Sequence, residues 1–323
     1  MAKLRRLLVL LAIGTFLALT VTGYAKDKYP SRPIELLVGY AAGGASDISA
    51  RMIAPFLEAE LGQPVVVVNK PGAGGEIAYT ALAKGSKEGY LLGFINAPAT
   101  ISIPLSHKVN YSMKDFAFIG NVIYHENLIV VKESGNYKTF EDLMAKAKQN
   151  PGVVTIGNSG PYADDHLASL AFQNSVGIKL KDIAFKGTAP SLVALLGGHI
   201  DSVVCNVADI VDHVQQGQIR VVATMGEERN PLFPNAPTLK EKGYKITMGN
   251  YTTLAAPSSI DSKRLRKLNV ALENAVNNPT FIKKASDAKL PVKYFNSKEI
   301  TKIYQQSDVS LQNLWKTLGL PTQ

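Results

Sequence analysis

The chain has 323 residues, a formal net charge of +9 and a hydrophobic content of 46%. Its cations are spread along the sequence without interleaved aromatic residues, which argues against a nucleic-acid partner. A mildly positive protein instead attracts small anions. The only cysteine, Cys205, cannot form an intramolecular disulfide, so the hydrophobic core has to hold a chain of this length together.

The N-terminal segment has the pattern of a secretory signal peptide. Three cations within the first six residues precede an apolar run over residues 7–22, and Ala25 ends a small-residue cleavage motif. The run is shorter than the roughly 20 apolar residues of a membrane span, which favours cleavage over the alternative of an uncleaved anchor. We expect a signal peptide at residues 1–25 and a mature periplasmic protein with a net charge of +6.

Short β-rich runs alternate with longer helical runs through most of the remaining chain. Before Asn127, strands are expected at 34–38, 65–68 and 90–95, with helices at 48–61 and 75–84. The pattern then restarts, with strands expected at 128–131, 153–156, 183–185, 202–205 and 219–224 and helices at 139–148, 164–175, 189–196 and 209–216. This alternation is typical of βαβ units and predicts a largely parallel sheet.

A Pro-rich stretch at residues 230–237 interrupts the alternation and predicts a surface connection. A short helix, an extended segment at 244–256 and three helical or mixed elements are expected after it. We interpret this order as two α/β lobes, one built from residues 26–124 and 246–323 and the other from residues 125–245. Two chain crossings between the lobes would form a hinge that lets a cleft close on a ligand.

Four small-residue loops, each between a strand and a helix, carry the functional signal. They lie at residues 40–47, 70–75, 157–163 and 186–190. Glycine allows backbone amides to approach a ligand, and the helix that follows adds unpaired N–H groups, which together bind anions. Each loop alone is also explained as an ordinary tight turn. Such loops in both lobes, however, predict an anion site at the carboxyl ends of the strands.

None of these loops has a phosphate-binding glycine motif, and none contains arginine. We therefore expect backbone amides, hydroxyls and water to hold a carboxylate ligand. Asp47 either caps the first helix and pairs with Arg51, or accepts a hydrogen bond from the ligand. Asp164 and Asp165 likewise either cap their helix or accept hydrogen bonds from a ligand hydroxyl or ammonium group.

The sequence lacks the motifs that are typical of catalytic sites. The five histidines have no metal-binding spacing, Ser159 is not in a nucleophile elbow, and Cys205 has no adjacent base. His166 is expected to form a local structural hydrogen bond. We expect no enzymatic activity, no metal and no cofactor, and a hydrolase lacks a credible nucleophile–base pair.

A series of short motifs runs along nearly all of the predicted mature chain, at residues 29–34, 43–51, 61–75, 88–90, 114–116, 186–190 and 195–201. Together these motifs resemble the Bug family, the periplasmic receptors of tripartite tricarboxylate transporters. The resemblance implies a two-lobed α/β Venus-flytrap fold of type II-like periplasmic binding proteins, with a hinge between lobes. It also implies a small carboxylate ligand and membrane permease subunits as partners, and a monomer is expected.

The resemblance places a ligand carboxyl at the first βα loop, held partly through ordered water. By position, the ligand-binding residues of the first lobe are Tyr40, Ala42, Gly43, Gly44, Ser46, Asp47, Asn96 and Thr100. Those of the second lobe are Asn158, Ser159, Gly160, Asp164, Lys186, Gly187, Thr188, Cys205 and Asn206.

The sequence departs from the family pattern at several of these positions. The family usually has aspartate where Cys205 stands, phenylalanine where Tyr40 stands, and uncharged residues where Asp164 and Asp165 stand. The second lobe has therefore lost one acid and gained another nearby, which leaves the ligand's distal group open. The resemblance also leaves open an alternative role as an extracytoplasmic sensor that presents its bound form to a signalling protein.

Overall fold

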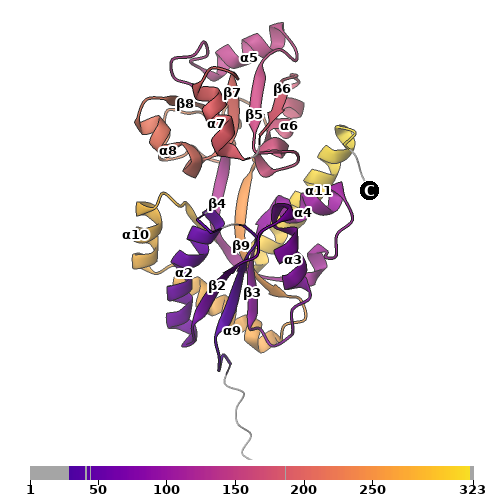
Figure 1. The fold of residues 1–323 in the computed structure, drawn as a ribbon, viewed down its shortest axis with the longest axis vertical. Coiled ribbons are helices and arrows are strands. Elements are labelled where there is room, and N and C mark those ends of the chain that lie inside the picture. Colours follow the sequence, from indigo (N-terminus) through magenta and orange to yellow (C-terminus); the bar gives the residue numbers. More distant parts are fainter. Residues whose placement is uncertain (1–28, 41, 44, 186, 321–323) are drawn as a thin grey trace, which may run out of the picture. The chain divides into compact units, whose positions relative to one another are not determined.

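A computed structural model of the protein describes residues 29–40, 42–43, 45–185 and 187–320 (Figure 1). The predicted signal peptide therefore lies outside the described residues. Residues 32–323 form one compact unit, and every element below belongs to it. Its strands join into a mixed sheet in the order β2-β1-β3-β9-β4-β7-β5-β6, with β8 and β10 also paired to β4.

The first group of elements is built around three parallel strands. These are β1 (Ile34–Val38), β2 (Val65–Asn69) and β3 (Leu91–Ala97), and β9 (Gly249–Pro257) joins β3 in the antiparallel direction. Figure 1 shows α2 and α3 beside these strands. The group also contains short 3₁₀ turns and the elements α2 (Ala45–Leu61), α3 (Glu76–Ala83), α4 (Ala99–Ser106), α9 (Ser262–Val276), α10 (Pro279–Asp287), β10 (Val292–Asn296) and α11 (Ser297–Thr317).

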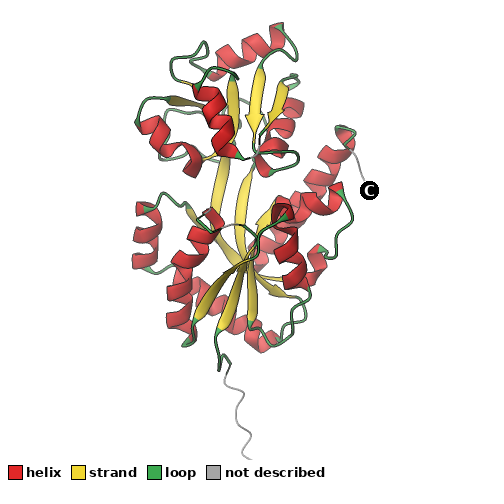
Figure 2. Cartoon of the chain, viewed as in Figure 1, coloured by secondary structure: helices red, strands yellow, loops and turns green. Residues whose placement is uncertain are grey.

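The second group repeats the same strand–helix alternation, as the colouring by secondary structure shows (Figure 2). Its strands are β5 (Thr155–Asn158), β6 (Lys181–Ala184), β7 (Ser202–Asn206) and β8 (Ile219–Thr224). Its helices are α5 (Phe140–Gln149), α6 (Asp164–Val176), α7 (Thr188–Leu196) and α8 (Val207–Gln215). Each strand and helix expected between residues 139 and 224 is present, with its ends shifted by at most two residues.

The 17-residue strand β4 (Phe116–Lys132) belongs to both parts of the sheet. Up to Glu126 it pairs with β9 and β10, and from Asn127 onward with β7 and β8. All of these pairings are antiparallel, so the expectation of a largely parallel sheet is wrong. Among the named strands, parallel pairing is confined to β1 with β2 and β3 and to β5 with β6 and β7. Successive strands within each of these sets are joined through a helix, as parallel pairing requires.

The segment after β8 also differs from expectation. Residues 239–243 form turns, so the short helix predicted after the Pro-rich stretch is wrong. The Pro-rich stretch itself connects elements at the surface, but Phe233 and Ala236 are buried against the core below it. Helix α4 was not expected, because Pro104 and the β-branched residues around it disguise the helical pattern.

Separate hydrophobic cores support the two groups of elements. In the first, Phe118 packs on Tyr304 with ring centroids 4.5 Å apart, next to the buried Trp315. In the second, Phe172 and Leu143 are fully buried under the β-sheet. Burying side chains of this size contributes about 1.5–3 kcal/mol each, which fixes the strand ends from which the site is built. The residue bounds of the two lobes stay a prediction.

Candidate functional site

A pocket of about 490 Å³ lies where loops from both groups of elements meet. The first group contributes the loop after β1, the turn before α3, one face of α4 and one residue of β9. The second group contributes the loop between β5 and α6. The lining residues are Tyr40, Ala73, Gly74, Ala99, Ser102, Ile103, Ser106, His107, Ser159, Gly160, Pro161, Tyr162, Ala163, Asp164 and Asn250. The carboxyl ends of parallel strands are the usual place for a ligand in such sheets.

Tyr40 closes the pocket on the side of the first group. Its hydroxyl donates to the carbonyl oxygen of Gly74 at 3.1 Å and lies 3.3 Å from the Tyr79 hydroxyl. Burial, followed by the proximity of Tyr79, raises the pKa of Tyr40 well above its usual value, and burial raises that of Tyr79 to about 12. Both phenols therefore keep their protons at neutral pH and remain hydrogen-bond donors.

Asp47 organises the loop after β1. Its Oδ2 accepts from the Gly43 amide at 2.8 Å and from Arg51 Nε at 3.0 Å, and its Oδ1 accepts from Asn69 Nδ2 at 2.8 Å. Burial works against the charge, but these hydrogen bonds and the Arg51 charge outweigh it and hold the pKa of Asp47 below its usual value. The predicted pairing with Arg51 is confirmed. Asp47 is the third residue of α2, so its prediction as the N-cap is wrong.

Asn96, at the end of β3, connects this loop to β9. Its Nδ2 lies 3.4 Å from Ser46 Oγ, 3.1 Å from Asn250 Oδ1 and 3.1 Å from Thr252 Oγ1. Its backbone oxygen accepts from Thr100 Oγ1 at 2.6 Å. Among the described residues, its buried Oδ1 has no hydrogen-bond partner. An unsatisfied buried acceptor of this kind is costly, unless a ligand or a water molecule completes it.

The loop between β5 and α6 is fastened to Asp165. The amide and hydroxyl of Ser159 both donate to its carboxylate at 2.7 Å, and the His166 amide donates at 2.8 Å. Burial, followed by the negative charge of Asp164, nevertheless raises the pKa of Asp165 to about 7. The N-cap of α6 is Ala163, so Asp164 and Asp165 are the first two residues of the helix and not its caps.

His166 has the local role expected from the sequence. Its Nδ1 accepts a hydrogen bond from the Tyr162 amide at 2.8 Å, which fixes the last turn before α6. Burial lowers the pKa of His166, which favours the neutral ring that this acceptor role requires.

Asp164 faces the pocket and is held by two asparagine amides. Its Oδ2 accepts from Asn206 Nδ2 at 3.2 Å and from Asn127 Nδ2 at 3.5 Å. Burial raises the pKa of the neighbouring Asp209 to about 6, although the hydrogen bond that Asp209 accepts from the Asn206 amide opposes this rise. The charge of Asp164 adds to the rise. Cys205 lies fully buried beside these acids, and burial followed by their charge raises its pKa, so it is a neutral thiol outside the pocket lining.

The remaining predicted residues fall into three sets. Gly44 and Lys186 lie outside the described residues. Ala42 and Gly43 are exposed in the loop before α2, and the Gly43 amide is already bound to Asp47. The Gly187 amide donates to the Ser159 carbonyl oxygen at 3.0 Å, and Thr188 begins α7.

Four predicted residues line the pocket directly: Tyr40, Ser159, Gly160 and Asp164. Others act one hydrogen bond behind the lining, since Asn158 Oδ1 accepts from the Gly160 amide at 3.1 Å and Asn206 holds Asp164. In the described part of the chain, the buried Asn158 Nδ2 and Asn127 Oδ1 have no hydrogen-bond partner. Buried amides with one unpaired atom each thus lie behind both sides of the pocket.

The pocket-lining residues at α4 and Asn250 of β9 were not predicted from the sequence. Ser102, Ser106 and His107 line the pocket, and His107 Nε2 lies 2.8 Å from Glu76 Oε2. A signal was present in the small residues that follow β3, which resemble the other strand–helix loops. Asn250 offered no signal, because it reaches the site only through the pairing of β9 with β3.

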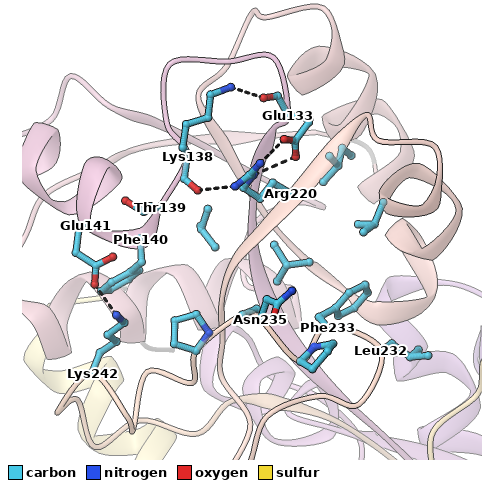
Figure 3. Close-up of a pocket in the computed structure, with 17 residues that line it drawn as sticks. Glu133, Lys138, Thr139, Phe140, Glu141, Arg220, Leu232, Phe233, Asn235 and Lys242 are labelled. Carbon is cyan, nitrogen blue, oxygen red and sulfur yellow. Dashed lines mark hydrogen bonds and ion pairs between the residues drawn. The ribbon is translucent and has the colours of Figure 1, made fainter.

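A second cavity, of about 580 Å³, lies near the N-terminus of α5 (Figure 3). Its charged side chains pair with one another, since Arg220 binds Glu133 and Lys242 binds Glu141. The Lys138 ammonium donates to the backbone oxygen of Glu133. Because these charges are already matched, this cavity is a weaker candidate for a solute site than the pocket between the loops.

Two further findings concern residues 29–40, 42–43, 45–185 and 187–320, the part of the chain that the structure describes. Within those ranges, no helix has the length and apolar character needed to cross a bilayer. The same ranges hold no group of three or more histidine, cysteine, aspartate or glutamate side chains that could bind a metal ion.

Comparisons with known proteins agree on one family. The model of the tripartite tricarboxylate transporter family receptor, TctC, matches residues 49–320. A curated relative, the UPF0065 protein in the gbd 5'region of Cupriavidus necator, is 35% identical over 295 residues, which cover 91% of this chain and 90% of that protein.

Solved structures give the same result for the fold. A TctC solute-binding protein from Polaromonas, determined without ligand, has a TM-score of 0.80 at 29% identity and covers 90% of this chain and 99% of its own. Rpa4515 of R. palustris with adipate, at a TM-score of 0.78 and 24% identity over 90% of this chain and 98% of its own, shares the fold. The expected two-lobed α/β fold of periplasmic binding proteins is confirmed, and the chain belongs to the TctC family of tripartite tricarboxylate transporter receptors.

Proposed function

We propose that this chain is a periplasmic solute-binding receptor that captures a small carboxylate between its two lobes and delivers it to a tripartite tricarboxylate-type permease. The observation that carries this proposal is the convergence of polar residues from both groups of elements on one pocket. One buried atom in each of three amide groups behind that pocket has no partner among the described residues: Asn96 Oδ1, Asn127 Oδ1 and Asn158 Nδ2. A ligand with its hydration water would complete such groups.

The ligand carboxyl is placed at the loop between β1 and α2. The 17-residue helix α2 begins there, and its first amides and partial positive charge favour an anion. Asp47 does not oppose this, because Arg51 and Asn69 already compensate its charge. Tyr40, at the edge of the same loop, keeps its proton and adds no negative charge there, because its pKa is raised. A carboxylate can therefore bind here without a guanidinium clamp.

The proposal also includes export of the protein and closure of its two lobes around the ligand. We propose that residues 1–25 are removed on export, and that residues 26–124 and 246–323 form one lobe and residues 125–245 the other. Strands β4 and β9, which pair from Phe116 to Glu126, would carry the hinge. Closure around these strands would bring the loops on either side of the pocket closer to a bound solute.

A thermal-shift screen of the purified protein against small mono- and dicarboxylates tests the proposal. A ligand present at a hundred times its dissociation constant should stabilise the folded state by about 2.7 kcal/mol. The corresponding neutral amides and alcohols, at the same concentrations, are the matched controls and should leave the melting temperature unchanged. If no carboxylate raises the melting temperature above its neutral control, the proposal is wrong.

A further inference from the structure

We propose that Asp164 is a specificity-determining residue that selects ligands carrying an ammonium group at the end opposite their carboxyl, so that the solute is an amino-carboxylate. This inference rests on the proposed function, because it names the class of carboxylate that the pocket takes.

The charge of the pocket lining is the first observation. Among the described residues that line the pocket, Asp164 is the only acid, and none is lysine or arginine. The lining also contains His107, whose ring Nε2 lies 2.8 Å from Glu76 Oε2. The side of the pocket formed by the second group therefore presents a fixed carboxylate without a neighbouring cation in the lining.

Asp164 is not occupied in capping its own helix. Helix α6 has Ala163 as its N-cap, with no side-chain capping bond. The recorded hydrogen bonds of Asp164 come instead from Asn127 on β4 and Asn206 at the end of β7. Two residues distant in sequence thus fix the carboxylate at the pocket, and neither of them neutralises its charge.

Asn127, which donates a hydrogen bond to this carboxylate, has a buried acceptor atom that lacks a hydrogen-bond partner within the described part of the chain. Its side chain is fully buried, and its Nδ2 donates both to Asp164 and to Asn206 Oδ1. Its Oδ1, however, has no partner among the described residues. An ammonium group has three donors and no acceptor, so it matches a site where a carboxylate lies beside an unsatisfied amide oxygen.

A ligand carboxylate would bind unfavourably next to Asp164. The negative charge of Asp164 raises the pKa of groups around it, including Asp165, Asp209 and Tyr40. A ligand carboxylate placed there would meet the same repulsion, whereas an ammonium would be attracted. The apolar lining from Ala99, Ile103 and Pro161 suits a short aliphatic spacer between the two ends of the ligand.

The test measures binding of two matched probe series by isothermal titration calorimetry. One series contains unbranched ω-amino acids of three to six carbons, and the other contains the dicarboxylates of the same lengths. We expect the best ω-amino acid to bind wild-type protein at least about tenfold more tightly than the dicarboxylate of its length. The variant Asp164→Asn should lose at least about tenfold in affinity for the ω-amino acid and should bind the dicarboxylate more tightly than wild type does. Tenfold corresponds to about 1.4 kcal/mol.

Asp212→Asn is the matched control, because Asp212 is an exposed residue of α8 outside the pocket lining. It should keep the wild-type preference, and thermal melts should show that both variants are folded. If wild-type protein prefers dicarboxylates and Asp164→Asn leaves that preference unchanged, the inference is overturned while the proposed receptor function stands. If neither series binds any of the three proteins, the inference is overturned, and the thermal-shift screen with other carboxylates decides separately on the receptor function.

Discussion

The two loops that frame the pocket each place a buried acid near the start of a helix, yet the acids end in opposite states. Asp47, after β1, is matched by Arg51 and Asn69, and its pKa is held below the usual value. Asp165, after β5, has only neutral donors and a second acid beside it, and its pKa rises to about 7. The groups that contact each carboxyl, and not its position on the helix, therefore determine whether it carries a negative charge. On the first side the buried acid is matched by a cation, whereas on the second side Asp165 is buried beside the negative charge of Asp164.

Removal of Asp47, the acid that pairs with a cation, should have the largest effect on stability. Asp47→Ala would leave the Gly43 amide, Arg51 and Asn69 without their common acceptor. Because Asp47 is only 2% exposed, we expect a loss of about 3 kcal/mol in the free energy of unfolding, measured by urea denaturation. Arg51→Ala is the control, and it should cost only about 1 kcal/mol, since the Arg51 side chain is 52% exposed. Equal losses in the two variants would contradict this account of the loop.

The second prediction uses pH to separate the two acids. Asp165 keeps its proton up to about pH 7 in the folded protein but releases it near pH 4 when unfolded. The folded state therefore binds more protons in this window, so the contribution of Asp165 to stability falls as pH rises from about 4 to about 7. Asp47 acts in the opposite sense, because its lowered pKa gives a contribution that is present above about pH 4 and lost on acidification.

Asp164→Asn removes one of the two causes that raise the pKa of Asp165. The decline in stability between about pH 5 and about pH 7 should therefore be smaller in this variant than in wild type, by about 1 kcal/mol. Urea denaturation at several pH values measures the difference. Identical pH profiles for the two proteins would show that Asp164 does not set the charge of Asp165.

A third prediction concerns the hydroxyls on either side of the pocket. Ser159 Oγ donates to Asp165 at 2.7 Å, whereas Ser46 Oγ only accepts a weak bond from Asn96 at 3.4 Å. Ser159→Ala should lower the free energy of unfolding by about 1 kcal/mol at pH 8, where Asp165 is ionised. Ser46→Ala should cost less than about 0.5 kcal/mol under the same conditions. A larger loss in Ser46→Ala would reverse the proposed order of the two contacts.

The sequence predicted most strands and helices because local periodicity and turn residues determine them. It failed at β4, where buried polar residues such as Asn121, His125 and Asn127 interrupt an otherwise apolar strand. Their polar side chains conceal the strand because burial is decided by neighbouring strands that lie far away in the sequence. The sheet direction failed for the same reason, since β4 and β9 pair across more than a hundred residues.

The sequence was sufficient to predict which loops form the site, but not the hydrogen bonds between residues of different loops and strands. Asn96 and Asn250 are 154 residues apart and meet only because β3 pairs with β9. The contact of Asp47 with Asn69 likewise depends on the pairing of β1 with β2. Asp164 was recognised as a departure from the family pattern, but its two asparagine partners come from β4 and β7 and were not predictable from local sequence.

A crystal structure of the protein grown with the strongest-binding carboxylate from the thermal-shift screen would show whether a small carboxylate occupies the pocket between the two loops. We expect one ligand whose carboxyl lies at the loop between Tyr40 and α2 and whose other end lies against Asp164. Ligand density in the cavity between Glu133 and Lys242, with the pocket beside Tyr40 unoccupied by it, would show that the solute binds elsewhere.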